Sequence, residues 1–416
     1  MDNLSYNKYL PIALLYFFFN GFFLPHGLLY TMILAPFFIL WLLIHHSAKP
    51  ILYFFPVILP FAIIHFINGV NTYFYIRSLV LLLAIYIFVI AFQHFLKICH
   101  TLRTLYKNIL LINALFVVFA MLVLFIPSLT SKFWYANEIT TGVIGIKRLQ
   151  MLTYEPSYYS SLLVPIALYY YLKVMLRQLP NTYTYLMLVS IPLLLSLSFG
   201  VILGLTFSLL FTLLSGFKTF FPNKNIPLYL ITGGIILLLL LVAFVQIFPE
   251  NVFVVRITNV LLGRDTSFNG RTTDSFFLGW SIAEKKSIWF GVGLGQVKEI
   301  GLPIFTVFYN YDFTIDMIGI PNSVADTLAT FGLVGVFIRL TVEVYFFFKT
   351  KVFTNYYRLS LFLFVFIYQF TGSFLTNTAE YVIWILAFAP GIFREFDRET
   401  LLSKRNTYKI SEPYVA

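Results

Sequence analysis

The chain has 416 residues, of which 60% are hydrophobic and only 11% are charged, and its formal net charge is +11. It holds 49 Phe and 28 Tyr, and a soluble core of this size could not bury so much apolar surface. Continuous apolar runs exclude a transmembrane β-barrel, whose strands alternate polar and apolar residues. The single cysteine excludes a disulfide framework and a cysteine zinc site. The composition therefore predicts an all-α, polytopic integral membrane protein.

Apolar runs recur from end to end, and a membrane-spanning helix needs about 17 to 25 such residues. We expect about twelve transmembrane helices in one membrane domain over residues 1–416. The expected spans are 9–24, 27–44, 51–67, 77–96, 108–126, 158–176, 183–198, 200–217, 226–248, 323–348, 359–376 and 381–393. At Ser198, one long kinked helix fits the pattern about as well as two short helices.

Lysine and arginine set the expected orientation, because positively charged loops are retained in the cytoplasm. With both termini inside, cations are more numerous on the inner side, which includes the basic tail 394–416. Most outer cations then fall in two loops, residues 127–157 and 249–322. The second loop has about seventy residues, and loops of that length are usually functional. We expect both loops on the outer, periplasmic face of a cytoplasmic membrane.

The 249–322 loop is expected to be partly helical. Apolar positions within residues 276–282 predict a helix that lies along the membrane face. Gly291, Gly293 and Gly295 permit a tight turn behind it. They are a weak nucleotide-binding motif, because no strand precedes them.

The apolar segment after this loop carries polar residues at defined positions. Asn322 or Ser323 is expected to cap the start of its helix. Arg339 and Glu343 lie four residues apart, so they share one helical face. We expect these two residues to form a structural ion pair within the span.

Three motifs follow one another along the chain. They are Arg148 with Tyr154-Glu155-Pro156-Ser157; Gly270-Arg271 followed by Trp280 and Gly291-Val-Gly293-Leu-Gly295; and Pro321-Asn322-Ser323 leading into Gly332-Leu-Val-Gly335. In this order they resemble the O-antigen polymerase and O-antigen ligase superfamily, closest to Wzy-type polysaccharide polymerases, over roughly residues 140–390. The resemblance implies a GT-C-like, inverting glycosyltransferase that uses undecaprenyl-diphosphate-linked sugars and no cofactor.

Charged residues at the outer ends of the expected spans are candidates for this reaction, because ionisable groups at membrane depth usually mark a functional site. Arg148 and Arg271 are the candidates for binding the departing diphosphate, because a guanidinium offers bidentate donors and stays protonated. Glu155 is the candidate base for the acceptor hydroxyl. The chain shows no convincing acidic cluster for a divalent metal, so we predict metal-independent transfer. Reserve candidates for the base are Asp274, Asp326 and Glu380.

Plainer roles for these residues remain open. In one alternative, Glu155 pairs with Arg148 and only holds the loop in place. In another, Arg271 is a solvated loop arginine or a contact to a lipid headgroup. Four further residues are candidates for substrate binding: Tyr154, Tyr158, Lys286 and Asn322. Tyrosine rings stack on sugars, but they more often anchor a protein at the membrane interface.

The resulting functional prediction is a polymerase for O-antigen or capsule. It transfers a growing glycan from undecaprenyl diphosphate to a lipid-linked repeat unit, with membrane lipids and a chain-length regulator as partners and no nucleic acid. The nearest alternative is an O-antigen ligase, but such ligases commonly carry a histidine in the long outer loop, and all six histidines here precede residue 101. A transporter or flippase of lipid-linked glycans also suits about twelve spans, although no related halves are evident. A pure scaffold is the remaining alternative.

Overall fold

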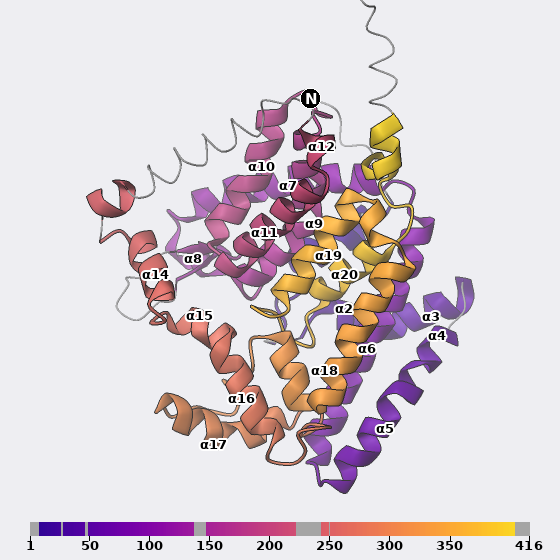
Figure 1. The fold of residues 1–416 in the computed structure, drawn as a ribbon, viewed down its shortest axis with the longest axis vertical. Helices are drawn as coiled ribbons and strands as arrows, with labels where there is room; N and C mark the ends of the chain where they lie inside the picture. Colours follow the sequence, from indigo (N-terminus) through magenta and orange to yellow (C-terminus); the bar gives the residue numbers. More distant parts are fainter. Residues whose placement is uncertain are drawn as a thin grey trace, which may run out of the picture.

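The computed structural model describes residues 8–25, 28–45, 49–136, 147–221, 243–248 and 250–403. Its regular structure is overwhelmingly helical, which confirms the all-α expectation (Figure 1). In these residues the one sheet is a short antiparallel hairpin of β1 (Trp134–Tyr135) and β2 (Arg148–Leu149).

The helices of the first half of the chain are α1 (Leu10–Leu14), the π-helix η1 (Leu15–Phe19), α2 (Tyr30–Ile33), α3 (Ala35–His45), α4 (Lys49–Leu52), α5 (Phe54–Ile67), α6 (Thr72–Ile98), α7 (Leu102–Val123), α8 (Pro127–Phe133), α9 (Pro156–Met175), α10 (Thr182–Ser196), α11 (Phe199–Ser215) and α12 (Phe217–Phe220). Those of the second half are α14 (Val252–Leu261), α15 (Thr266–Arg271), α16 (Thr273–Ala283), α17 (Val297–Tyr309), α18 (Ser323–Lys349), η2 (Val352–Thr354), α19 (Tyr356–Tyr368), α20 (Thr378–Phe388) and η3 (Arg394–Phe396).

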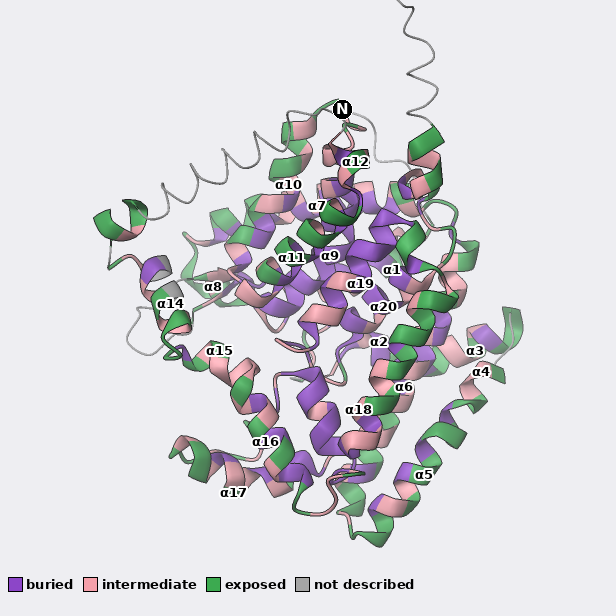
Figure 2. Cartoon of the chain, viewed as in Figure 1, coloured by how far each residue is buried: buried purple, intermediate pink, exposed green. Residues whose placement is uncertain are grey.

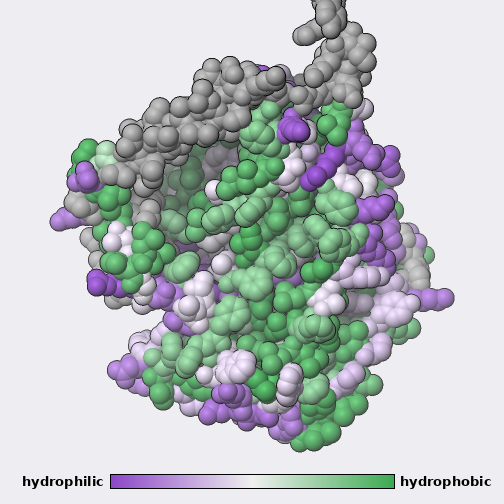
Figure 3. Space-filling view, in the orientation of Figure 1, coloured by the Kyte–Doolittle hydropathy of each residue, from purple (hydrophilic) through white to green (hydrophobic). Residues whose placement is uncertain are grey.

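Four helical segments of the described chain are long and apolar enough to cross a membrane: Lys49–Ile67, Thr72–Ile98, Leu102–Val123 and Ser323–Lys349. Shorter apolar helices occupy other expected spans. Large apolar side chains are exposed over α5, α6 and α18 and form wide hydrophobic areas (Figures 2 and 3). Apolar areas of this extent fit a lipid environment. The number twelve stays a prediction, and the expected span 226–248 lies mostly outside the described residues.

Helix α9 forms the centre of the packed region. Sixteen of its 20 residues are buried, and it packs against α10, α11, α19 and α20. A helix that is apolar on all sides is expected in such a position. Because α9 begins directly after Glu155, this buried helix fixes the place of a predicted site residue.

Two separate helices replace the uncertain span around Ser198. Helix α10 ends at Ser196 and α11 begins at Phe199. Leu197 between them has φ 46°, in the left-handed region that stops an α-helix. The two-helix interpretation is therefore confirmed.

The 249–322 segment is partly helical, as expected, and contains α14, α15, α16 and α17. The first three follow one another down one side of the molecule (Figure 1). Helix α16 covers the predicted range 276–282, and its buried residues include Leu278 and Ile282. These side chains join a small apolar core with α17 and the start of α18.

The glycine-rich stretch fills a break in α18. Gly332 interrupts that helix with φ 67° and ψ −166°. The carbonyls of Ala329 and Thr330 accept hydrogen bonds of 2.9 and 3.0 Å from the N–H groups of Val292 and Gly293. On the other side of the break, the N–H groups of Leu333 and Val334 donate to the carbonyls of Ile288 and Trp289, both over 3.0 Å.

These four hydrogen bonds satisfy main-chain groups that the break in α18 would otherwise leave unpaired in a buried region. They also explain the glycines. Gly291, Gly293 and Gly295 all have positive φ, and a Cβ on Gly291 would lie 2.4 Å from the main chain of Thr330. The stretch forms the expected tight turn. Its positive φ angles and its close packing against α18 at Gly291, and against α5 and α6 at Gly293 and Gly295, explain why it needs glycine.

Candidate functional site

Glu155 and Arg271 form an ion pair between two distant segments. Glu155 is the N-cap of α9, yet its side chain makes no capping hydrogen bond. Its Oε1 instead lies 3.1 Å from Nη2 of Arg271, the last residue of α15. The two side chains are 23% and 31% exposed, so both keep access to solvent or ligand. The structure thus brings together two of the three predicted catalytic residues.

The charge of Arg271 is stabilised by its surroundings. Burial lowers the pKa of the guanidinium, but the Glu155 carboxylate and, after it, the Tyr368 phenol raise it, and the net shift is upward. Arg271 is therefore a permanent cation beside a carboxylate.

Asn322 holds Arg271 in place. Its Oδ1 accepts a hydrogen bond of 3.0 Å from the N–H of Ala325, so Asn322 is the cap of α18, as one of the two expectations had it. Its Nδ2 donates to the main-chain carbonyls of Arg271 and Phe370 over 2.9 and 2.6 Å. The residue is fully buried. This geometry favours a positioning role over the direct substrate contact predicted for Asn322.

Arg148 has a different partner from Arg271. It stands on β2 opposite Tyr135 of β1, and its Nε donates to the carbonyl of Ser196 at the end of α10 over 3.1 Å. Glu155 forms an ion pair with Arg271. Tyr135 also acts electrostatically on Arg271, so the β1–β2 hairpin that carries Arg148 lies near Arg271 as well.

Tyr154 and Tyr158 stack on each other, with ring centroids 4.7 Å apart. Tyr158 is 2% exposed. Its hydroxyl accepts from Nδ2 of Asn20 over 2.9 Å and shares a 3.0 Å hydrogen bond with Thr378. Tyr158 therefore supports the start of α9 from within the core, away from a sugar. Tyr154 lies between this core and Glu155, and burial, followed by Tyr158 and Glu155, raises its pKa.

Lys286 lies away from the Glu155–Arg271 pair. It follows the far end of α16, whose 11 residues span about 16 Å, whereas Arg271 precedes the start of that helix. Its Nζ donates to the carbonyl of Gly69 in the turn between α5 and α6. Burial lowers its pKa, and Glu299 offsets part of that effect. Lys286 therefore links the segment after α16 to the turn between α5 and α6. The sequence did not indicate this role.

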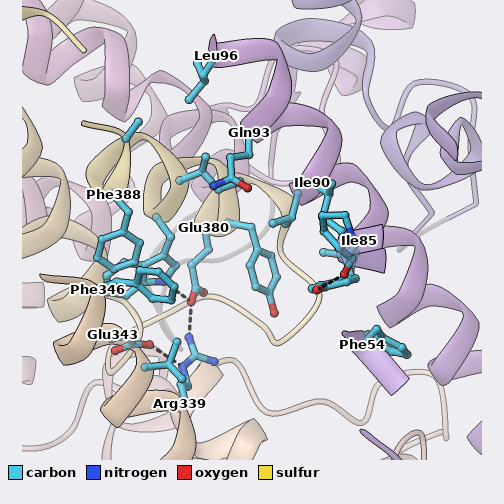
Figure 4. Close-up of a pocket in the computed structure, with 18 of the residues that line it drawn as sticks. Phe54, Ile85, Ile90, Gln93, Leu96, Arg339, Glu343, Phe346, Glu380 and Phe388 are labelled. Atoms are coloured by element: carbon cyan, nitrogen blue, oxygen red, sulfur yellow. Dashed lines mark hydrogen bonds and ion pairs between the residues drawn. The ribbon is translucent and has the colours of Figure 1, made fainter. Parts of the chain in front are cut away.

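A buried ionic network adjoins the site. Arg339 and Glu343 form the expected ion pair, with Nε and Oε1 3.2 Å apart. Arg339 also binds Glu380 of α20 (Figure 4), and its Nη2 donates to the hydroxyl of Ser323 over 3.0 Å. Since Ser323 follows Asn322 directly, the network is joined to the residue that holds Arg271.

The sequence indicated only part of this network. The spacing of Arg339 and Glu343 predicted their pairing, but the participation of Glu380 carried no local signal, because it is 41 residues from Arg339. The other reserve candidates have structural partners: Asp274 accepts from the hydroxyl of Tyr309 over 3.3 Å, and Asp326 accepts from the N–H of Leu375 over 3.2 Å.

Among the residues that the structure describes, no group of three His, Cys, Asp or Glu side chains is placed to hold a metal ion. Comparison with known proteins adds no assignment: no protein-family model matches the chain, and no curated protein matches its sequence.

Proposed function

We propose that this chain is a membrane-embedded glycosyltransferase that lengthens a bacterial surface polysaccharide. One observation supports this most: Glu155 and Arg271 meet at 3.1 Å although 116 residues separate them, and Asn322 of the third motif binds Arg271. Three motifs with no local reason to converge thus share one small region. Convergence of charged residues at the edge of a membrane protein is typical of a binding or catalytic site.

In the proposed reaction, the donor glycan is linked to undecaprenyl diphosphate and the acceptor is a lipid-linked repeat unit. The acceptor hydroxyl oxygen attacks the anomeric carbon while Glu155 takes its proton. The bond between that carbon and the phosphate oxygen breaks, and the electron pair leaves with the diphosphate. Arg271 stabilises the charge that develops there, with Arg148 as a second cation nearby. Attack from the side opposite the leaving group inverts the anomeric configuration.

The observed ion pair gives this proposal a specific sequence of steps. While Glu155 and Arg271 bind each other, each charge partly cancels the electrostatic attraction that the other would exert on a substrate. A diphosphate carries more negative charge than a carboxylate, so it competes for the guanidinium. Transfer of Arg271 from Glu155 to the phosphate would free the carboxylate to accept the acceptor proton only when the donor is bound.

We also propose that the chain crosses a bacterial cytoplasmic membrane about twelve times, with the 127–157 and 249–322 segments on the periplasmic face. The polymerase is favoured over the ligase by the histidine-free outer segments.

The test is the surface-glycan ladder of cells whose own gene is replaced by variants. Arg271→Lys keeps the charge and loses the bidentate fork, and Glu155→Gln keeps the shape and loses the base. Loss of one such group typically costs about 10²–10³ in rate, so both ladders should collapse to short chains. Arg264→Lys, an exposed arginine of the same segment, is the control and should give a normal ladder.

The phenotype also separates the candidate functions. A polymerase defect leaves a single repeat unit on the surface, whereas a ligase defect leaves long chains on the carrier lipid. Normal ladders for Arg271→Lys and Glu155→Gln at normal protein levels would refute the proposed site.

A further inference from the structure

A second site lies within the apolar part of the molecule. A cavity of about 1270 Å³ runs between α5, α6, α18 and α20 and is lined mainly by apolar side chains (Figure 4). Two of them, Ile338 and Val342 of α18, are 39% and 45% exposed. The cavity is therefore open toward the surroundings of α18, where lipid would lie. We call it the α6–α18 cavity.

One end of the α6–α18 cavity is cationic. The lining there includes Lys97 at the end of α6, His100, Arg103 at the start of α7, and Arg394 of η3. All four residues are exposed, and Arg103 also pairs with Glu395 over 2.6 Å. The acidic residues of the lining, Glu343 and Glu380, lie with Arg339 instead.

The dimensions of the cavity fit a lipid chain. The lining residues on α6 extend from Leu82 to Lys97, a length of about 22 Å at 1.5 Å per residue. Half the hydrocarbon core of a bilayer is about 15 Å thick, so an acyl chain of one leaflet fits along this wall. A basic entrance above an apolar slot between membrane helices is typical of a site for anionic lipid headgroups.

We propose that the α6–α18 cavity binds an anionic glycerophospholipid. Its phosphate lies at the end formed by Lys97, His100, Arg103 and Arg394. One acyl chain follows α6 past Ile90 and Ile85 toward the apolar residues Phe54 and Leu82. Charge complementarity selects the headgroup, and the apolar wall accommodates the chain.

This lipid is distinct from a donor bound at Arg271. Helix α9 begins next to Glu155, and Lys173 near its other end lies 3.9 Å from Glu395, the partner of Arg103. The 20 residues of α9 separate these ends by about 30 Å. A phosphate at the cationic end therefore cannot also contact Arg271. The inference does not depend on the proposed glycosyltransferase activity.

The test uses the purified full chain in detergent, with native mass spectrometry to measure binding of dioleoylphosphatidylglycerol against dioleoylphosphatidylcholine. We expect preferential binding of the anionic lipid. The double variant Lys97→Gln with Arg394→Gln should bind it about thirtyfold more weakly, because each basic residue near an anionic headgroup contributes about fivefold. The control is Lys349→Gln with Lys351→Gln, two exposed lysines outside the cavity lining.

A second pair of variants tests the slot itself. Val342→Trp adds a bulky ring to the lining at the open side of the cavity, whereas Val344→Trp adds the same ring to a 44% exposed position of α18 outside the lining. Only Val342→Trp should weaken binding. Equal affinity for the two lipids, or equal binding by the two tryptophan variants, would refute the proposal. So would displacement of the phospholipid by geranylgeranyl phosphate at lower concentration, since the cavity would then belong to isoprenoid lipids.

Discussion

The side-chain amide of Asn322 donates a hydrogen bond of 2.9 Å to the main-chain carbonyl of Arg271. The same amide donates to the carbonyl of Phe370, just after α19, and its oxygen caps α18. One buried side chain therefore joins the ends of α15 and α19 to the start of α18. A change at Asn322 should move Arg271 without removing any atom of the ion pair with Glu155.

We predict that Asn322→Ser weakens both stability and activity. Serine is a good N-cap, so the start of α18 is retained. The carbonyls of Arg271 and Phe370 lose their donor, and each unsatisfied buried group costs about 1–3 kcal/mol. Thermal unfolding of the purified protein should show the loss of stability, and the glycan ladder should shorten. Asn71→Ser, at the exposed cap of α6, is the matched control; equal effects of the two changes would contradict the positioning role.

Gly332→Ala should prevent folding of the region around α18. A Cβ at this position would lie 2.3 Å from the main chain of Trp289, and φ is +67°. A backbone with φ +67° and ψ −166° is essentially restricted to glycine and costs another residue about 1–3 kcal/mol, and the clash adds to this cost. Gly319→Ala is the control, since nothing lies within 4 Å of its added methyl group. Size-exclusion chromatography of detergent extracts measures the outcome, and a monodisperse Gly332→Ala protein with unchanged unfolding temperature would disprove the account of the helix break.

Much of the helical layout was predictable because apolar runs report it directly, as α6 and α18 show. The convergence of Glu155 with Arg271 was less accessible, since local patterns carry no information about partners 116 residues apart. Likewise, nothing near Tyr158 indicated that Asn20 and Thr378 would occupy its hydroxyl. The glycines predicted a turn, but the helix break that they fill is a tertiary feature. Periodicity predicts elements, whereas pairing of buried polar groups depends on the assembled fold.

Arg339→Met should destabilise the protein strongly. The guanidinium contacts Glu343, Glu380 and Ser323, and its removal leaves two buried carboxylates without their cation. Breaking a buried ion pair from one side typically costs about 3–5 kcal/mol. Adding Glu343→Gln and Glu380→Gln to Arg339→Met should restore part of the unfolding temperature, because no uncompensated charge remains.

The exposed Lys349→Met, on the same helix, is the control for Arg339→Met and should have little effect. If the triple variant is no more stable than Arg339→Met alone, charge compensation is not the main role of Arg339.

The proposed reaction predicts resistance to metal chelators. Arg271, assisted by Arg148, would neutralise the leaving diphosphate, a role that a divalent cation fills in other transferases. Chain extension by membranes carrying the protein should therefore continue in excess EDTA at an unchanged rate. Loss of extension in EDTA with recovery on adding Mg²⁺ or Mn²⁺ would contradict this mechanism.

The predicted orientation places Lys285 outside the cell membrane and Lys349 inside. The chain has one cysteine, Cys99, which is buried, so a Cys99→Ser background removes competing thiols. Lys285 and Lys349 are both exposed, and cysteine at either position should accept a maleimide once the reagent reaches it. A membrane-impermeant maleimide applied to spheroplasts should label Lys285→Cys and leave Lys349→Cys unlabelled until the membrane is permeabilised. The reverse pattern would place Arg271 and its segment in the cytoplasm, where a periplasmic lipid-linked glycan could not reach it, and the proposed polymerase would then be excluded.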